Sequence, residues 1–122
     1  MIYLASPYSH PDPDVREWRY QKVCRVTALL MVAGLNIFSP IAHTHPIAKY
    51  GSLDALDADF YLKYDKEMLG FAEGMYILML DGWEQSYGIG EERKFANDKN
   101  IPVGYLDSIT LELIPKEELG TQ

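Results

Sequence analysis

The sequence predicts an α/β fold: a single-domain three-layer sandwich with a four- or five-stranded parallel sheet, flavodoxin-like or Rossmann-like. Two observations carry this prediction. Short apolar runs typical of strands alternate with longer segments whose apolar residues recur at helical spacing. The run at 75–80 is the longest apolar run and favours a central strand buried on both faces. With 122 residues and no repeat or linker, residues 1–122 are expected to form one domain.

The amino-terminal part is predicted to contain a strand and a long helix. Residues 2–5 form a short apolar run, and a loop follows it. Asp12 before Pro13 indicates a helix start, because aspartate caps a first turn and proline suits the first helical position. Gly34 is expected to end this helix. Its apolar periodicity comprises Val15, Trp18, Lys22 or Val23, Val26, Leu30 and Ala33.

The middle of the chain is predicted to contain a second strand, a loop and a second helix. Residues 35–39 form a short strand that Pro40 stops, and 41–52 are expected to form a long loop. Asp54 can cap a helix over about 55–70. One side of that helix carries Leu56, Phe60, Tyr64 and Met68.

The last third is predicted to alternate strand, helix and strand. Residues 74–80 form the central strand, and a polar loop follows at 81–87. Gly88 is expected to open a third helix that reaches about Lys99, before a fourth strand at 101–106. A short fifth element is expected in the tail, which contains Leu111, Leu113, Ile114 and Leu119.

Three of the predicted loops should meet at one edge of the sheet. In open parallel sheets, ligands bind beyond the carboxyl ends of the strands. The segments 6–10, 40–52 and 81–90 approach that edge, so the functional residues are sought there.

Composition restricts the classes of partner. Eleven basic and 18 acidic residues give a formal charge of −7, and the basic residues are scattered, which argues against binding a nucleic acid polymer. A small anion remains compatible, because helix N-termini bind anions. No apolar run reaches membrane-spanning length, so no membrane partner is expected. The absence of a basic leader and the single cysteine, Cys24, favour a cytoplasmic protein.

A homo-oligomer, at least a dimer, is also expected. A short chain covers the faces of a four- or five-stranded sheet sparsely. The two tryptophans and nine tyrosines exceed the needs of a small core, and aromatic residues favour interfaces.

Glu92 is the most informative charged residue. Its neighbours three or four positions away, Ile89, Phe95 and Ala96, place it on the inward stripe of the third helix. Burying a carboxylate is costly, so this position requires an explanation. A capping role fits poorly, because a cap at Gly88 would make Glu91 the third helical residue. Catalysis and a structural role remain about equally supported by the pattern.

The segment before Glu92 suits an anionic ligand. Gly88 and Gly90 allow the backbone to come close to a ligand, and free N–H groups at a helix start favour a negative charge.

Asp65 shows the same anomaly as Glu92. Its neighbours Tyr61, Met68 and Leu69 are apolar or aromatic, although a solvated helix charge is the simpler interpretation. His43 and His45 have a spacing that a metal can use, but no third ligand is evident, and no metal site is predicted.

These residues together resemble the nucleoside 2-deoxyribosyltransferase superfamily, which includes nucleoside 5′-monophosphate N-glycosidases. The resemblance covers about residues 2–106. It is carried by the opening strand with Tyr3 and the following Ser-Pro, by Asp65, by the glycine-rich turn 88–92 with the aromatic-alanine pair 95–96, and by the turn 100–103. The segment 82–86 also resembles small, poorly characterised members of the DUF1937 type.

The resemblance implies a double displacement without metal or organic cofactor. Glu92 would attack the anomeric carbon, Asp65 would assist departure of the base, and Tyr3 would hold Glu92 in position. A glycosyl-enzyme ester would then be resolved by water or by a second base.

The resemblance also bears on the substrate. Ser86 occupies the position where the monophosphate hydrolases carry a serine that contacts the 5′-phosphate, whereas transferases often carry an acidic residue. The hydrolases have an arginine in the first loop, where this chain has Ser9 or His10. Ser6, Ser9 and His10 are the candidates to replace it.

The expected function is therefore hydrolysis of the N-glycosidic bond of a nucleoside or deoxynucleoside 5′-monophosphate. A base-exchanging deoxyribosyltransferase, a nucleotide-binding module without turnover and a purely structural α/β protein are the alternatives. Release of free base from nucleosides or 5′-monophosphates would distinguish these possibilities.

Overall fold

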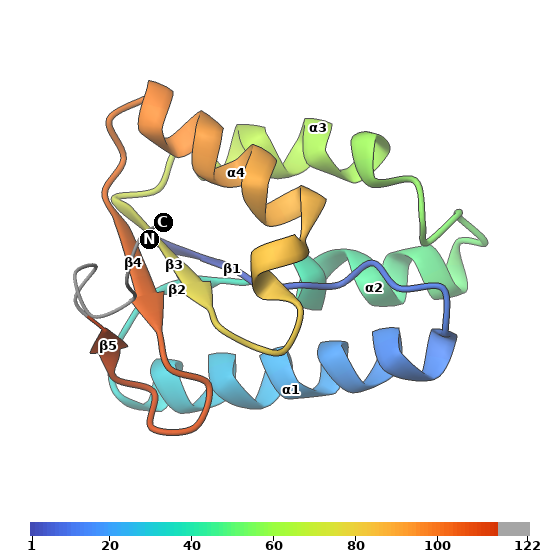
Figure 1. Cartoon of the computed structure of the whole chain (residues 1–122), viewed down its shortest axis with the longest axis horizontal. Helices are drawn as coiled ribbons and strands as arrows, with labels where there is room; N and C mark the ends of the chain where they lie inside the picture. The colour runs from blue at the N-terminus through green and yellow to red at the C-terminus, as the bar shows by residue number, and fades with distance from the viewer. Residues whose placement is uncertain (115–122) are drawn as a thin grey trace.

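A computed structural model of the chain describes residues 1–114 and confirms the α/β sandwich. One five-stranded sheet has the order β2-β1-β3-β4-β5. Helices α3 and α4 lie on one face and α1 lies on the other, while α2 lies beyond the carboxyl ends of β1 and β2 and contacts α1 (Figure 1). The helices and strands are β1 (Ile2–Ala5), α1 (Pro13–Val32), β2 (Ile37–Phe38), α2 (Pro40–Tyr50), α3 (Ala58–Leu69), β3 (Gly74–Leu78), a 3-10 turn (Trp83–Gln85), α4 (Tyr87–Asp98), β4 (Val103–Leu106) and β5 (Leu113–Ile114).

Alternating side chains of the central strands fill two cores. Tyr3 of β1 and Met75 of β3 are fully buried on the side of α3 and α4. Leu4 and Leu78 are fully buried on the opposite side, together with Val23 of α1. Burying one large apolar side chain contributes roughly 1.5–3 kcal/mol, so the strands are held from both faces. The apolar run predicted as a central strand therefore has the expected burial.

The sheet is parallel except at one edge. Strands β2, β1, β3 and β4 pair in parallel, whereas β5 pairs antiparallel with β4. The connection of residues 107–112 is too short for the crossover that a parallel neighbour needs. Of the predicted tail element, Leu113 and Ile114 form β5, and Leu119 lies outside the described residues.

The segment predicted as a long loop contains helix α2, so that prediction is wrong. Ser39 caps the helix by accepting a hydrogen bond from the Ala42 N–H at 3.1 Å, and Pro40 occupies the first turn. Pro40 is thus a helix start rather than only a strand stop. Pro46 lies inside the helix, although proline cannot donate the backbone hydrogen bond of that position.

Helix α3 begins later than predicted. Asp57, not Asp54, is its cap, and its side chain accepts from the Phe60 N–H at 3.3 Å. The inward face carries Leu62, Asp65 and Leu69. The side of the helix described in the sequence analysis faces outward: Phe60, Tyr64 and Met68 are exposed by 41, 51 and 37 per cent, and Leu56, which precedes the helix, by 50 per cent.

The topology defines a crevice between β1 and β3. Strand β1 has β2 on one side and β3 on the other, so the direction of chain progression reverses there. Such a switch point separates the loops at the carboxyl ends of the two strands and leaves room for a ligand.

Candidate functional site

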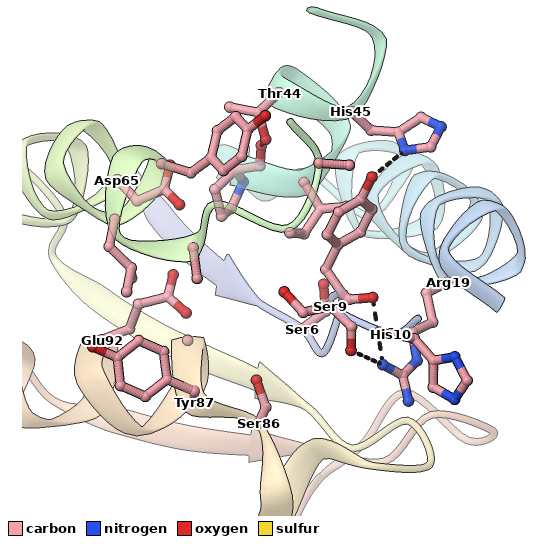
Figure 2. Close-up of a pocket in the computed structure, with 18 of the residues that line it drawn as sticks. Ser6, Ser9, His10, Arg19, Thr44, His45, Asp65, Ser86, Tyr87 and Glu92 are labelled. Atoms are coloured by element: carbon pink, nitrogen blue, oxygen red, sulfur yellow. Dashed lines mark hydrogen bonds between the residues drawn. The ribbon is translucent and has the colours of Figure 1, made fainter. Parts of the chain in front are cut away.

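A cavity of about 390 Å³ opens at this crevice. Small-molecule sites usually span roughly 300–1,000 Å³. All three segments expected at the edge of the sheet contribute to it: the loop after β1, helix α2, and the loop before α4 with the first turn of that helix. Helix α3 closes a further side (Figure 2).

Glu92 and Asp65 point into the cavity from neighbouring helices (Figure 2). Helix α4 begins at Tyr87 with Ser86 as its cap, one residue before the predicted start. Glu92 therefore lies in the second turn, where it caps nothing. The side chains of Glu92 and Asp65 are only 4 and 9 per cent exposed.

Tyr3 acts on the cavity through Glu92. Its hydroxyl donates a hydrogen bond to Glu92 Oε2 across 89 positions of sequence. Tyr3 is fully buried in the core and does not line the cavity. The tyrosine therefore orients the carboxylate rather than contacting a ligand.

Burial changes the protonation of both carboxyl groups. Burial raises the pKa of Glu92 to about 8, against the opposing effect of the hydrogen bond from Tyr3, and the charge of Asp65 raises it further. Burial raises the pKa of Asp65 to about 7. Two interacting carboxyl groups titrate as a pair, so this pair retains a proton into the neutral range. Chemically, it can supply one nucleophile and one proton donor.

Most, but not all, of the candidate phosphate-contacting residues line the cavity. Ser6, Ser86 and Gly88 line the cavity, whereas Gly90 does not. Ser6 is buried, and its Oγ has no hydrogen-bond partner among residues 1–114. Ser86 Oγ accepts from the Ile89 N–H at 3.2 Å, so this serine is both a helix cap and part of the wall.

The two remaining candidates lie at the outer end of the first loop. Ser9 is exposed and His10 half-buried, and both line the cavity. The His10 ring accepts the Asp12 N–H at Nδ1, at 3.0 Å, which orients the ring.

Arg19 is a cavity residue that the sequence analysis missed. Its guanidinium donates to the carbonyl oxygens of Ser9 at 3.1 Å and Asp81 at 3.2 Å, which ties together the loops after β1 and β3. A Cβ at Gly82, whose φ is +93°, would lie 2.6 Å from Arg19 Nη2, so the glycine makes room for this cation.

A detectable signal for Arg19 was present in the sequence. Arg19 falls between Val15 and Val23 at helical spacing, on the inward stripe of α1. The sequence analysis gave Trp18 that place, but Trp18 is 50 per cent exposed. A cation on an apolar stripe is the same anomaly that singled out Glu92.

Tyr8 and His45 were also missed as a pair. Tyr8 Oη lies 2.8 Å from His45 Nδ1, and both residues line the cavity. Within residues 1–114, no three His, Cys, Asp or Glu side chains gather as a metal site requires. His45 instead lies 3.6 Å from Glu17 and stacks on Tyr20.

Comparison with known proteins gives a family. The family model described as a domain of unknown function (DUF1937) matches residues 1–107. No curated protein matches the chain. In the described part of the chain, none of the helices combines the length and apolar character that crossing a membrane requires.

Proposed function

Starting from the DUF1937 family, to which this chain belongs and whose description assigns no activity, we propose that the protein cleaves the N-glycosidic bond of a nucleoside 5′-monophosphate. We also propose that this family is related to the nucleoside 2-deoxyribosyltransferases. The observation that carries the proposal is a pair of buried carboxyl groups, Glu92 and Asp65, that face one cavity while Tyr3 orients Glu92. A purely structural role would not explain why both carboxyl groups are buried, since their burial costs free energy.

The proposed reaction has two steps. In the first, a carboxylate oxygen of Glu92 bonds to the anomeric carbon while the bond from that carbon to the base nitrogen breaks. The electron pair leaves with the base, which takes a proton from Asp65. In the second, water attacks the anomeric carbon, its proton passes to Asp65, and the ester electron pair returns to Glu92. Free base and sugar 5′-phosphate result.

A cluster of donors supports a phosphate on the substrate. Ser6 offers a buried hydroxyl without a partner, Ser86 offers a second hydroxyl, and the first turn of α4 offers backbone N–H groups. Arg19 supplies a positive charge at the same cavity, whereas the monophosphate hydrolases carry an arginine in the first loop. Charge-assisted hydrogen bonds contribute roughly 1.5–3 kcal/mol each, so two of them favour the monophosphate over the nucleoside at least tenfold.

The test is release of free base from a panel of 5′-monophosphates and the matching nucleosides. Glu92→Gln should lose several orders of magnitude in rate, on the order of 4–8 kcal/mol. Glu91→Gln is the matched control, because Glu91 pairs with Lys94 at 3.0 Å and does not line the cavity. Mass spectrometry of the parent protein, quenched during turnover, should detect a sugar-phosphate ester on the peptide that contains Glu92.

The outcomes separate the alternatives. Near-parent turnover by pure Glu92→Gln would refute the nucleophile. Exchange of a labelled free base into the substrate at a rate above hydrolysis would make the protein a transferase. Tight nucleotide binding with no base release under any condition would make it a binding module.

A further inference from the structure

Three polar side chains, Tyr8, His45 and Glu17, form a chain that starts at the cavity. Tyr8 and His45 line the cavity, with His45 on the side away from Glu92 (Figure 2), and Glu17 borders the smaller adjoining hollow. Tyr8 Oη lies 2.8 Å from His45 Nδ1, and His45 Nε2 lies 3.6 Å from Glu17 Oε2. The imidazole also stacks on Tyr20, with ring centroids 4.0 Å apart and an interplanar angle of 20°. The chain thus connects the loop after β1 with α2 and α1, and its members cannot rotate freely.

The direction of the hydrogen bond from Tyr8 follows from Glu17. A carboxylate only accepts, so the ring proton of neutral His45 is favoured on Nε2, which faces Glu17. Burial lowers the pKa of His45, against the opposing effect of Glu17, so the ring is neutral. Nδ1 then accepts, and Tyr8 donates its only hydroxyl proton to it. The Tyr8 oxygen retains lone pairs alone for any other partner.

The surroundings of Tyr8 suit one part of the proposed substrate. On the side of the cavity that holds Tyr8 and His45, Ala48 and Ala55 form an apolar part of the wall. The smaller hollow that adjoins this side also carries Arg16, Glu17 and Lys49. With the anomeric carbon at Glu92 and the phosphate at Ser86, the base is the portion left to occupy this apolar side. A base has apolar faces and a polar edge, so an apolar wall with one fixed acceptor matches it.

We propose that Tyr8, held by His45 and Glu17, is a specificity-determining residue that accepts a hydrogen bond from an amino group on the edge of the base. The proposal rests on the proposed function. The favoured substrates are therefore nucleotides of amino-bearing bases. A keto analogue directs a carbonyl oxygen at the lone pairs of Tyr8 and leaves both acceptors unpaired, which costs roughly tenfold or more in affinity.

The experiment compares substrates that differ only in this group. kcat/KM is measured for the 5′-monophosphates of adenine against hypoxanthine and of cytosine against uracil. At least one pair should favour the amino member about tenfold or more. Tyr8→Phe should bring that ratio close to one, and Glu17→Gln should reduce it, because the glutamine amide no longer selects the Nε2 proton. Thermal unfolding of each variant verifies that it is folded.

Tyr61→Phe is the matched control. Tyr61 also lines the cavity, but its hydroxyl donates to the Asp54 carbonyl at 2.7 Å. Its removal should leave the amino-to-keto ratio unchanged. A merely structural role of Tyr8 would lower both members of a pair by the same factor. That result, or a parent ratio of one in both pairs, would overturn the proposal.

Binding separates this inference from the proposed reaction. The same four nucleotides are titrated calorimetrically into the parent protein and into Glu92→Ala. A binding preference for the amino members without any base release would support the role of Tyr8 and refute the reaction. Base release without preference would refute Tyr8 alone, and neither binding nor release would overturn both.

Discussion

At the scale of single residues, two features of the site have opposite effects on the pKa of Glu92. Burial favours the neutral form of Glu92, whereas the hydroxyl of Tyr3 favours its charged form. For the proposed reaction, this balance would leave the ionised carboxylate reactive, because the hydrogen bond from Tyr3 is the one that stabilises its charge among the described residues. Burial also raises the pKa of the neighbouring Asp65, to about 7, so the two interacting carboxyl groups share a proton in the neutral range, and the proposed reaction requires that proton to be on Asp65 when the base leaves.

Tyr3→Phe tests this balance. Without the donated hydrogen bond, the pKa of Glu92 rises further above about 8. The proposed reaction requires ionised Glu92, so the rising limb of the plot of kcat/KM against pH should move to higher pH by about one unit, which corresponds to about 1.4 kcal/mol. The measurement is the pH profile of base release by the parent and the variant.

A uniform loss of rate would give a different profile. If the rising limb of Tyr3→Phe stayed at the pH of the parent while the whole curve dropped, Tyr3 would support packing rather than the charge on Glu92. Circular dichroism of the variant provides the folding control.

At the scale of elements, the start of helix α4 combines two roles. Ser86 caps the helix through the Ile89 N–H and also lines the cavity. The cap fixes the first turn, and the first turn fixes where Gly88 and Glu92 face the cavity. One residue therefore links local stability with the geometry of the site.

Substitutions of Ser86 can separate the two roles. Ser86→Ala should lower the free energy of unfolding by about 1 kcal/mol, because the cap is lost, and should reduce the preference for monophosphate over nucleoside. Ser86→Asp should retain the cap and the stability, since aspartate caps as well as serine. Its charge should nevertheless repel phosphate and reverse the preference. Chemical denaturation and paired kcat/KM values provide the two measurements.

One result for Ser86→Asp would contradict the role of Ser86 in phosphate binding. If Ser86→Asp used monophosphates as efficiently as the parent, the phosphate would lie elsewhere, and Ser86 would be a helix cap alone.

At the scale of the whole molecule, the buried carboxyl groups make stability depend on pH. The folded pKa values of Glu92 and Asp65 are raised to about 8 and about 7, so the folded state binds more protons than the unfolded state from about pH 4 upward. The stabilisation is therefore complete below about pH 4, declines as pH rises from there, and is fully lost once pH has passed the folded pKa values of about 7 and about 8. Each group changes the free energy of unfolding by at most about 1.4 kcal/mol per pH unit.

Glu92→Gln should remove one part of this dependence. The amide does not titrate, so the Tm of the variant relative to the parent should increase from pH 5 to pH 8.5. Thermal unfolding across this range measures the difference. Glu91→Gln, on the partly exposed flank of α4, should give a constant difference. If the curves of Tm against pH were parallel for Glu92→Gln and the parent, burial would not raise the pKa of Glu92.

The homo-oligomer expected from the sequence remains a prediction, and we expect its contact to lie on the outward side of α3. Phe60 and Tyr64 pack ring against ring at 5.5 Å while both remain about half exposed, next to Leu56 and Met68. Such a contiguous apolar stripe is typical of an interface. Sedimentation should show at least a dimer, and Tyr64→Lys should weaken it. Tyr50→Lys, at a more exposed position on α2, should not. A monomer at micromolar concentration would contradict the prediction.

Local periodicity in the sequence determined most of the strands and helices and the inward positions of Glu92 and Asp65. These features depend on spacing within one element, because residues three or four positions apart share a helix face wherever that helix packs. Helix α2 was not predicted, because Pro40 was interpreted as the stop of a strand and 41–52 as a loop, whereas Pro40 begins the helix and Pro46 lies inside it. The sequence also did not predict which side of α3 faces the sheet, because both sides carry apolar residues.

Only the tertiary structure decided which distant residues meet. The hydrogen bond from Tyr3 to Glu92 joins positions 89 residues apart, and Arg19 joins two loops that follow different strands. The Tyr8–His45–Glu17 chain likewise requires α1, α2 and the first loop to pack together. Such contacts depend on strand order and on the packing of helices against the sheet. Neither leaves a signature in the spacing of residues along one segment.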